Sequence, residues 1–405
     1  MNVLFLSPGY PPEMAQYVRG LTEVGANVFG VGDSPTGGLH PEVRGRLTDY
    51  LHVPRILDEE DVIARVGEWL RGRTVARIEA QWEVLVLLAA RLRERHGVPG
   101  MSVDTVLGFR DKELMKARVA AAGLRVPRSA RARTTSEAWA AAERIGFPLI
   151  IKPIAGAGSA DTYRVDSAAE LHQILARTEH VPEVSVEEFV DGEEFTHDTI
   201  CVDGKPVFEN VCQYLPRPLV ARSVESISPI ICTVRDLRQA KIEAGLKLGR
   251  GVLQALGMQT GFTHMEWYLK ADGEVVFGEI GCRPGGAHLA DQMNFTCDTD
   301  VFREWARAVC WSDFAGRSER LYNCAIVFKR ARGQGRIQRI DGLDGFKRRH
   351  GRWLCWENLL PVGTQRRNWK ATLLSDGFLI VRHPDWDSAL AIAQDAADEI
   401  QMVAE

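Results

Sequence analysis

The 405-residue sequence has no marked excess of charge, no Cys-x-x-Cys pair, no internal repeat and no low-complexity tract. Its 50 Lys and Arg against 54 Asp and Glu give a net charge of −4, which supplies no general field to hold a nucleic acid. The eight cysteines lie far apart, which argues against a zinc or dithiol site and favours reduced, buried thiols. We therefore expect no nucleic acid among the partners.

The apolar start at residues 1–6 is short. Ser7-Pro8-Gly9 ends it and no basic residue precedes it, so it is too brief for a signal peptide or a membrane span. A composition that is 45% hydrophobic and 26% charged is typical of a globular chain, not of a disordered, collagen-like or membrane-spanning one. We therefore expect a cytoplasmic protein without a membrane partner.

The length predicts several packed units, because a single core rarely exceeds about 250–300 residues. Short apolar runs alternate with amphipathic stretches between residues 3 and 95. A strand followed by a helix, repeated, indicates a parallel sheet with helices on its faces. We expect this N-terminal unit to end near residues 97–100, where two glycines and a proline interrupt the pattern.

A glycine-rich loop at residues 155–161 lies between two predicted strands, 147–153 and 162–165, and a helix follows only at 168–177. A dinucleotide fingerprint or a Walker loop instead opens directly into a helix. The order of elements, and the absence of Gly-Lys-[Ser/Thr], disfavour both motifs. They favour a hairpin whose exposed backbone N–H groups fold over phosphates, since glycine allows close approach.

The remaining pattern alternates strands and helices. Ser136 is the predicted N-cap of a helix that ends at Ile145. Further predicted elements are strands at 184–189, 199–202, 206–211, 323–329 and 373–381 and helices at 235–256 and 386–402.

Two acidic residues lie in a predicted late hairpin, with strands 263–270 and 274–279 joined by Asp272-Gly273. Glu266 and Glu279 are each six or seven positions from this turn, so they can pair across the strands and face the same way. Two adjacent carboxylates need a counter-cation, and Mg²⁺ bridging phosphate oxygens is the usual one. The alternative is two exposed hairpin glutamates.

Cationic and imidazole side chains follow the same hairpin. Arg283 lies in the loop Gly281-Cys282-Arg283-Pro284-Gly285-Gly286, where it could neutralise charge on a phosphoryl group or an oxyanion, although alone it is typical of a surface ion pair. His264 and His288 are candidates for orienting phosphate or substrate or accepting a proton, with a structural role as the alternative. Arg217 and Arg222 are weaker candidates for binding a substrate carboxylate.

In this order and spacing the sequence resembles the ATP-grasp superfamily. The segments that carry the resemblance are Asp111-Lys112, Ile151-Lys152-Pro153, the glycine-rich loop, the run from Val186 to Phe195, Met265-Glu266 and Gly278-Glu279-Ile280-Gly281-Cys282-Arg283. The resemblance extends from the N-terminal unit through residue 300.

The resemblance implies a fold class and a domain layout. An α/β N-terminal (pre-ATP-grasp) domain would occupy residues 1–100, and an α+β ATP-grasp fold of two lobes clamping ATP would follow. The small, lid-bearing lobe would span 101–185 and the large lobe with the metal site 186–310. A small mixed α+β subdomain would complete the chain at 311–405.

The resemblance also implies roles for single residues. Lys112 and Lys152 would contact the phosphates, Glu187 and the backbone near Val190 the adenine, and Glu194 the ribose. Gly156, Gly158 and Ser159 would form the lid loop. Glu266 and Glu279 would hold Mg²⁺ or Mn²⁺, and Arg283 would steady an acyl phosphate. The negative charge of ATP requires several cationic side chains around it, and phosphoryl transfer requires mainly positioning and charge neutralisation.

The implied chemistry is ATP-dependent joining of a carboxylate to an amine through an acyl phosphate, with release of ADP and phosphate. Two positions depart from relatives: Gly281 stands where many have an Asn that binds metal, and Ala287 stands where biotin carboxylases have a glutamate base. The second departure disfavours bicarbonate activation. The run from Glu279 to Gly286 looks closer to ligases of amino acids and dipeptides.

Two other functions stay open at this point. One is a ligase or carboxylase of nucleotide or one-carbon metabolism within the superfamily. The other is a nucleotide-binding protein without turnover, for which the missing Asn would mark a decayed metal site. Small carboxylate and amine substrates are the expected partners, and a homodimer is expected only by analogy.

Overall fold

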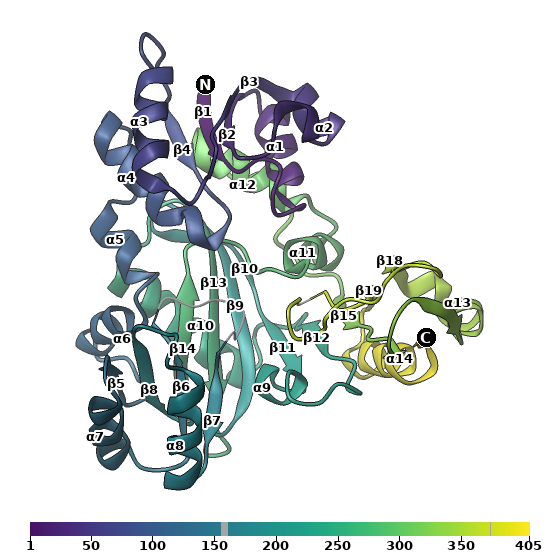
Figure 1. The fold of residues 1–405 in the computed structure, drawn as a ribbon. Coiled ribbons are helices and arrows are strands. Elements are labelled where there is room, and N and C mark those ends of the chain that lie inside the picture. Colours follow the sequence, from purple (N-terminus) through teal and green to yellow (C-terminus); the bar gives the residue numbers. More distant parts are fainter. Residues whose placement is uncertain (155–160, 373) are drawn as a thin grey trace.

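The computed structural model describes residues 1–154, 161–372 and 374–405. The N-terminal unit is a parallel sheet in the order β3-β2-β1-β4, which confirms the predicted alternation of strand and helix (Figure 1). Along β1, Val3 and Phe5 face one core while Leu4 and Leu6 face another, because successive side chains of a strand point to opposite faces. The elements are β1 (Asn2–Leu6), α1 (Met14–Glu23), β2 (Asn27–Gly32), η1 (Thr36–Gly38), α2 (Pro41–Arg46), β3 (Leu47–His52), α3 (Glu59–Trp69), β4 (Arg77–Glu79), η2 (Glu83–Leu85) and α4 (Val86–His96).

A smaller antiparallel sheet in the order β5-β8-β6-β7 follows, with α7 and α8 packed on it. Strands β6 and β7 pair directly, so the glycine-rich loop does join two strands as predicted. The positions expected to form the lid, Gly156, Gly158 and Ser159, lie outside the described residues. The elements are α5 (Val103–Gly108), α6 (Lys112–Ala121), β5 (Ser129–Ala132), α7 (Thr135–Ile145), β6 (Leu149–Pro153), β7 (Tyr163–Val165), α8 (Ala168–Arg177) and β8 (Val184–Glu188).

One cap prediction in this unit is wrong. The Thr134 hydroxyl, not Ser136, accepts the N–H of Glu137, at 3.2 Å. Thr134 has extended backbone angles, as an N-cap residue requires, and Ser136 already lies inside the first turn. The helix therefore begins one residue earlier, at Thr135.

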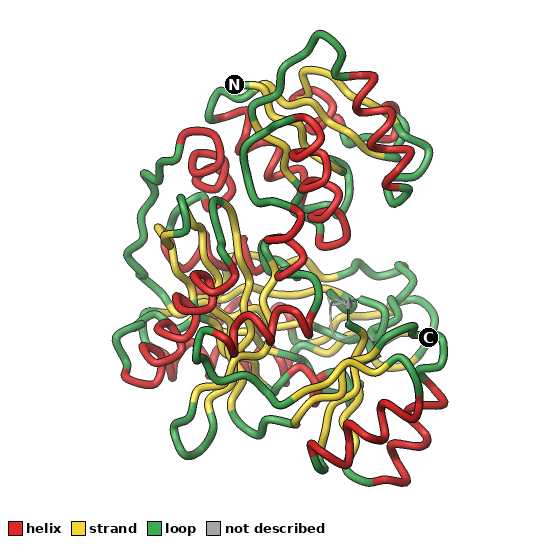
Figure 2. The backbone as a smooth tube through the Cα atoms, turned by 90° about the vertical axis from the view of Figure 1, so that its left-hand side faces the viewer, coloured by secondary structure: helices red, strands yellow, loops and turns green. Residues whose placement is uncertain are grey.

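The largest sheet runs in the order β14-β13-β9-β11-β12-β15-β19-β18, with β10 paired to β9 (Figures 1 and 2). Its first elements are β9 (Glu193–Val202), β10 (Lys205–Asn210), β11 (Cys212–Leu215), α9 (Pro218–Ala221), β12 (Ile230–Thr233), α10 (Ala240–Leu256), β13 (Gly261–Leu269), β14 (Val275–Gly281), α11 (Leu289–Cys297) and α12 (Val301–Trp311). The C-terminal elements are β15 (Asn323–Phe328), β16 (Arg332–Gly333), β17 (Ile337–Asp341), α13 (Leu343–His350), η3 (Gly351–Trp353), β18 (Leu354–Leu359), β19 (Gly377–His383), α14 (Trp386–Glu399) and β20 (Gln401–Ala404).

Several boundaries differ from the predictions, among them those of β9, α10 and the final helix. Strand β9 is continuous from Glu193, because it pairs with β13 along its whole length and its buried polar residues find partners there. Helix α10 begins at Ala240, after a turn in which the Asp236 carboxylate accepts the N–H of Arg238. The final helix ends at Glu399, because residues 401–404 pair as β20 with β16 and β17.

The N-terminal unit lies at one end of the molecule in both views (Figures 1 and 2), and its helix α1 packs against α12. Tyr17 of α1 packs edge-on against Phe302 and Trp305 of α12, with ring centroids 5.0 and 5.2 Å apart. A Cβ atom at Gly20 would come within 2.5 Å of the Phe302 carbonyl oxygen, so only glycine lets these two helices approach this closely.

These sheets confirm the predicted class, an α/β unit followed by α+β units. The domain boundaries stay predictions. Strands β15, β18 and β19, from beyond residue 310, continue the same sheet as β9 to β14. In the described ranges, no helix has both the length and the apolar character that crossing a lipid bilayer requires.

Candidate active site

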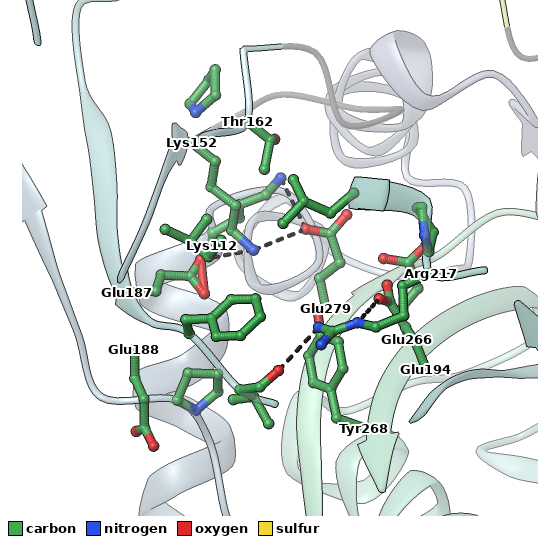
Figure 3. Close-up of a pocket in the computed structure, with 17 residues that line it drawn as sticks. Lys112, Lys152, Thr162, Glu187, Glu188, Glu194, Arg217, Glu266, Tyr268 and Glu279 are labelled. Atoms are coloured by element: carbon green, nitrogen blue, oxygen red, sulfur yellow. Dashed lines mark hydrogen bonds and ion pairs between the residues drawn. The ribbon is translucent and has the colours of Figure 1, made fainter. Parts of the chain in front are cut away.

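A pocket lies between the small sheet and the large sheet, with α6 and α9 at its margins (Figure 3). The strands that converge on it are β6 and β8 from one side and β9, β13 and β14 from the other. Its polar and aromatic lining includes Lys112, Lys152, Glu187, Glu194, Arg217, Glu266, Tyr268 and Glu279, together with Val190. Eight of the residues singled out from the sequence thus meet in one place.

Lys112 and Lys152 approach one carboxylate from two elements (Figure 3). Lys112 is the first residue of α6, which Asp111 caps by accepting the N–H groups of Glu113 and Leu114 at 3.1 and 3.0 Å. Its Nζ lies 3.4 Å from Glu279 Oε2, and Lys152 Nζ, at the end of β6, lies 3.5 Å from the same oxygen. Two ammonium groups held this close form a site for an anion.

The Lys152 ammonium also contacts Glu187, whose Oε1 lies 2.7 Å from Nζ. Glu187 lies on β8 and is 4% exposed, and Lys116 Nζ lies 3.3 Å from the same oxygen, Oε1. Burial alone would raise the pKa of Glu187, but the charges of Lys116 and Lys152 outweigh it and lower that pKa. Burial likewise lowers the pKa of Lys152, but Glu187 and Glu279 outweigh it, so Lys152 stays cationic.

Glu266 and Glu279 lie directly opposite each other in the β13–β14 pair, so the predicted hairpin register is confirmed. The register shifts immediately afterwards, where a Cβ at Gly278 would lie 2.7 Å from the carbonyl oxygen of Glu266. Because glycine has no Cβ, Gly278 permits the bulge beside the two carboxylates. The Tyr214 hydroxyl also donates to Glu266 Oε1, at 3.0 Å.

The two carboxylates differ in charge environment. Burial and the neighbouring Glu279 charge raise the pKa of Glu266. Burial would also raise the pKa of Glu279, but the charges of Lys112 and Lys152 outweigh burial and lower that pKa to about 2. The pair is short of positive charge on the Glu266 side, which a divalent cation would supply.

The donor set fits a metal that shares its ligands with phosphate. Within the described residues, no group of three or more His, Cys, Asp or Glu is arranged to hold a metal ion. Mg²⁺ commonly uses one or two carboxylates and takes its other ligands from phosphates and water. Glu266 and Glu279 suit that arrangement and do not form an all-protein cage.

Arg217 lies across the part of the pocket predicted for the nucleoside (Figure 3). Its Nε donates to Glu194 Oε2 at 3.2 Å and its Nη2 to the Val190 carbonyl at 3.0 Å. The guanidinium carbon lies 5.2 Å from the ring centre of Tyr268. Burial and the Glu266 charge raise the pKa of Glu194 to about 8, although Arg217 acts in the opposite direction. Arg217 therefore holds the Val190 carbonyl, expected near adenine, and the Glu194 carboxylate, expected at the ribose.

Arg283 contacts the N-terminal unit. Its Nε donates to Glu83 Oε2, and Arg110 donates to the other oxygen of the same carboxylate. Burial would lower the pKa of Arg283, but Glu83 outweighs it and raises that pKa. A side chain at Gly281 would meet this ion pair, because Glu83 Oε2 lies 3.2 Å from the Cβ position. Glu83 thus stands beside the position where many relatives carry the metal-binding Asn.

The two candidate histidines lie in different surroundings. His264 Nδ1 lies 2.5 Å from Asp198 Oδ1, and its Nε2 is 3.9 Å from Glu266 Oε1. Burial would lower the pKa of His264, but Asp198 outweighs it and raises that pKa. His288 precedes α11, bonds Asp291 through Nδ1 at 2.8 Å and packs against Trp356. The structure therefore brings His264, not His288, beside the paired carboxylates.

Residues 145–291, which carry most of this pocket, match the family model described as ATP-grasp domain. This segment is an ATP-grasp domain. The chain is 27% identical over 215 residues to the L-arginine-specific L-amino acid ligase of Bacillus subtilis, and the match covers 51% of each chain. The chain thus spans about half the length of this relative.

Solved structures show the same fold over the whole chain. The L-amino acid ligase from Bacillus licheniformis aligns with a TM-score of 0.81 at 19% identity, covering 100% of this chain and 98% of that one. The N5-carboxyaminoimidazole ribonucleotide synthetase from Thermotoga maritima aligns with a TM-score of 0.74 at 16% identity, covering 100% and 99%. At these identities the likeness concerns the ATP-grasp fold alone.

The ATP-grasp motifs did not point to several residues of the site. Lys116 follows Lys112 by one helical turn, and that spacing alone could have placed both on one face of α6. Glu83, Asp198 and Tyr214 left no such signal, because each reaches its partner across a distant part of the chain. Arg222 lies away from the pocket and donates to the Lys370 carbonyl at 2.7 Å.

Proposed function

We propose that the protein is an ATP-dependent carboxylate–amine ligase that joins amino acids or small peptides. The observation that carries the proposal is the meeting of Lys112, Lys152, Glu266 and Glu279 in one pocket between two sheets. The likeness to an L-amino acid ligase at 27% identity supports the choice of substrate class.

In this proposal Lys112 and Lys152 bind the triphosphate and neutralise part of its charge. Lys116 and Glu187 hold the Lys152 ammonium in position. Glu266 and Glu279 would hold Mg²⁺ or Mn²⁺, which when bound supplies charge neutralisation at the phosphate oxygens. Glu194 and the Val190 backbone would contact the nucleoside once the Arg217 guanidinium releases them.

The reaction has two steps. An oxygen of the substrate carboxylate attacks the γ-phosphorus, the bond to the β-phosphate oxygen breaks, and ADP leaves. The amine then attacks the acyl carbon of the acyl phosphate, loses a proton, and phosphate departs. Arg283 would stabilise negative charge on the acyl phosphate, with Glu83 fixing its direction. Exclusion of water would protect the intermediate from hydrolysis.

The test is incubation with ATP, Mg²⁺ and pooled amino acids, with ADP measured by a coupled assay and products by mass spectrometry. We expect Mg²⁺-dependent ADP release together with a condensed product. Glu279→Gln should reduce that release by about 100-fold or more while leaving the circular dichroism spectrum unchanged, because it removes metal-binding charge without changing volume.

Other outcomes point elsewhere. Release of AMP and pyrophosphate would contradict an acyl phosphate. ADP release that requires bicarbonate in place of an amino acid would favour a carboxylase of the kind that acts in nucleotide metabolism. Nucleotide binding without hydrolysis under any of these conditions would indicate a binding protein. A homodimer stays a prediction, and none of these assays depends on it.

A further inference from the structure

A second cavity, with a volume of about 1130 Å³, shares the segment 215–228 with the nucleotide pocket. Arg217, Pro218 and Leu219 line the nucleotide pocket, whereas Leu215, Pro216 and residues 225–228 line the second cavity. Helix α14 and residues 329–334 complete its wall. The volume is sufficient for a ligand the size of a dipeptide, since small-molecule sites typically measure about 300–1,000 Å³.

One wall of this cavity carries Lys329, Arg330 and Arg332, none of which forms an ion pair with another described residue. Lys329 is 3% exposed, and its Nζ donates to Ser228 Oγ at 3.1 Å and to the Ala396 and Ala397 carbonyls at 3.2 and 2.5 Å. In the described part of the chain, no carboxylate forms an ion pair with it, unlike Lys112, Lys116 and Lys152. Burial lowers the pKa of Lys329 to about 8. The Asp398 carboxylate, which lines the same cavity, acts on that pKa in the opposite direction.

Two arginines beside it have unused donors. Arg330 Nη1 donates to the Ala221 and Val224 carbonyls, both at 2.9 Å, and its guanidinium stacks on Trp369, 4.5 Å from the ring centre. Among the described residues, its Nη2 has no hydrogen-bond acceptor and Arg332 has neither an ion pair nor a side-chain hydrogen bond. A planar guanidinium matches a carboxylate, which it can bind with two parallel hydrogen bonds.

The rest of the wall is mixed. Two carboxylates line it, Asp398 and Glu225, of which Glu225 pairs with Arg366. Leu215, Pro216, Ile227, Ile230 and Leu390 supply an apolar surface. Inorganic phosphate would satisfy the arginines but leave this surface in contact with water. An organic anion that also has an apolar body would cover it, at a gain proportional to the buried area.

We propose that this cavity is a second ligand site for a small organic carboxylate with an apolar body, and that α9 couples its occupancy to the nucleotide pocket. The coupling follows from the two ends of α9. Arg217, at its N-terminal end, holds Glu194 and the Val190 carbonyl in the nucleotide pocket. Arg330, in the second cavity, holds the Ala221 carbonyl at its C-terminal end. A carboxylate that draws Arg330 toward itself shifts α9 and with it Arg217.

The binding test uses the dipeptide leucyl-phenylalanine and its C-terminal amide, titrated calorimetrically into the full chain. The dipeptide should bind saturably, and the amide about tenfold more weakly or not at all, because it lacks the carboxylate. Arg332→Gln should weaken dipeptide binding by about tenfold or more, and Ala391→Trp, which narrows the cavity from α14, should also weaken it. The matched control is Arg348→Gln, an exposed arginine on α13 outside the cavity, which should bind like the parent.

The coupling test measures the Kd of MgADP with and without the dipeptide. We expect a change of about fivefold or more, reciprocal in the two ligands. This effect should be absent in Arg332→Gln, whose MgADP affinity alone should match that of the parent. Neither readout requires turnover, so failure of the proposed ligase activity leaves both interpretable.

The proposal is overturned if the dipeptide does not bind at millimolar concentration, or if inorganic phosphate binds in the cavity as tightly as the dipeptide. It is also overturned if Arg332→Gln and Ala391→Trp bind the dipeptide like the parent, because the ligand then occupies another site, such as that of a reaction product. Binding without any change in the Kd of MgADP would refute the coupling through α9.

Discussion

Lys152 and Glu187 form a buried ion pair in which Nζ lies 2.7 Å from Oε1. The two residues lie on the paired strands β6 and β8, and Lys116 of α6 contacts the same carboxylate at 3.3 Å. The ion pair thus links two strands and a helix, and it holds the Lys152 ammonium that also faces Glu279. The stability of the fold and the position of this lysine are therefore coupled.

Glu187→Gln should destabilise the protein by about 3 kcal/mol, because it leaves two buried lysines short of a counter-charge. Urea denaturation gives the free energy of unfolding. Glu188→Gln is the control on the same strand: its partners Arg125 and Arg128 are 32% and 63% exposed, so the loss should be smaller, about 1 kcal/mol. Equal losses for the two variants would mean that the buried pair makes no special contribution.

Arg283→Ala should lower kcat by about 100-fold or more and change the Kd of MgADP by much less, because Arg283 is not among the described residues that line the nucleotide pocket. Steady-state kinetics and nucleotide titration separate the two effects. Glu83→Gln keeps the arginine but weakens its anchoring, so it should lower kcat by a smaller factor. A parallel loss of nucleotide affinity in Arg283→Ala would argue for a role in binding ATP.

Glu209 should make stability depend on pH at the acid end. Burial alone would raise its pKa, but hydrogen bonds from His197 and Arg250 outweigh it and lower the pKa to about 2. In the unfolded chain the same carboxyl group has a pKa of about 4.3. Since the folded pKa is the lower one, the carboxylate stabilises the protein above the unfolded pKa, and this contribution is lost as the pH falls toward 2.

Urea midpoints measured between pH 6 and pH 3 check this expectation. Glu209→Gln should be less stable than the parent at pH 6, and the difference should shrink on acidification. Glu319→Gln, at an exposed residue with no ion pair among the described residues, should show no difference at either pH. A constant difference for Glu209→Gln across the range would exclude the proton linkage.

Gly245→Ala should destabilise the protein by about 1–3 kcal/mol even though alanine favours helices, because its Cβ would lie 2.2 Å from the Trp267 ring on β13. Gly67→Ala is the matched change in α3, where the nearest atom would be His96 Cε1 at 3.9 Å. That variant should gain about 0.5–1 kcal/mol. Thermal unfolding of both variants tests the pair, and stabilisation of Gly245→Ala would show that α10 can move away from the sheet.

Local sequence patterns were sufficient to predict structure where a single turn or a single periodicity sets which residues pair. The Asp272-Gly273 turn predicted that Glu266 faces Glu279, and the structure reaches this pairing through the bulge at Gly278, since the pairs nearer the turn are offset by one residue. The same reasoning missed the continuous strand β9. Its polar run Thr196, His197 and Asp198 reads as exposed, yet all three are buried, with Thr196 and Asp198 bonded to each other and His197 bonded to Glu209.

By itself, the sequence determined the order of strands and helices, the glycine-rich connection between two strands, and which acidic and basic residues belong to the ATP-grasp motifs. Those features depend on neighbours a few positions apart, where backbone geometry sets which side chains share a face. Only the tertiary structure decided that Glu83 meets Arg283, 200 positions away, that Arg217 holds Glu194, and that Lys329 and Arg330 line a second cavity. Charges separated by long stretches of chain come together through packing, and no local pattern records which of them will meet.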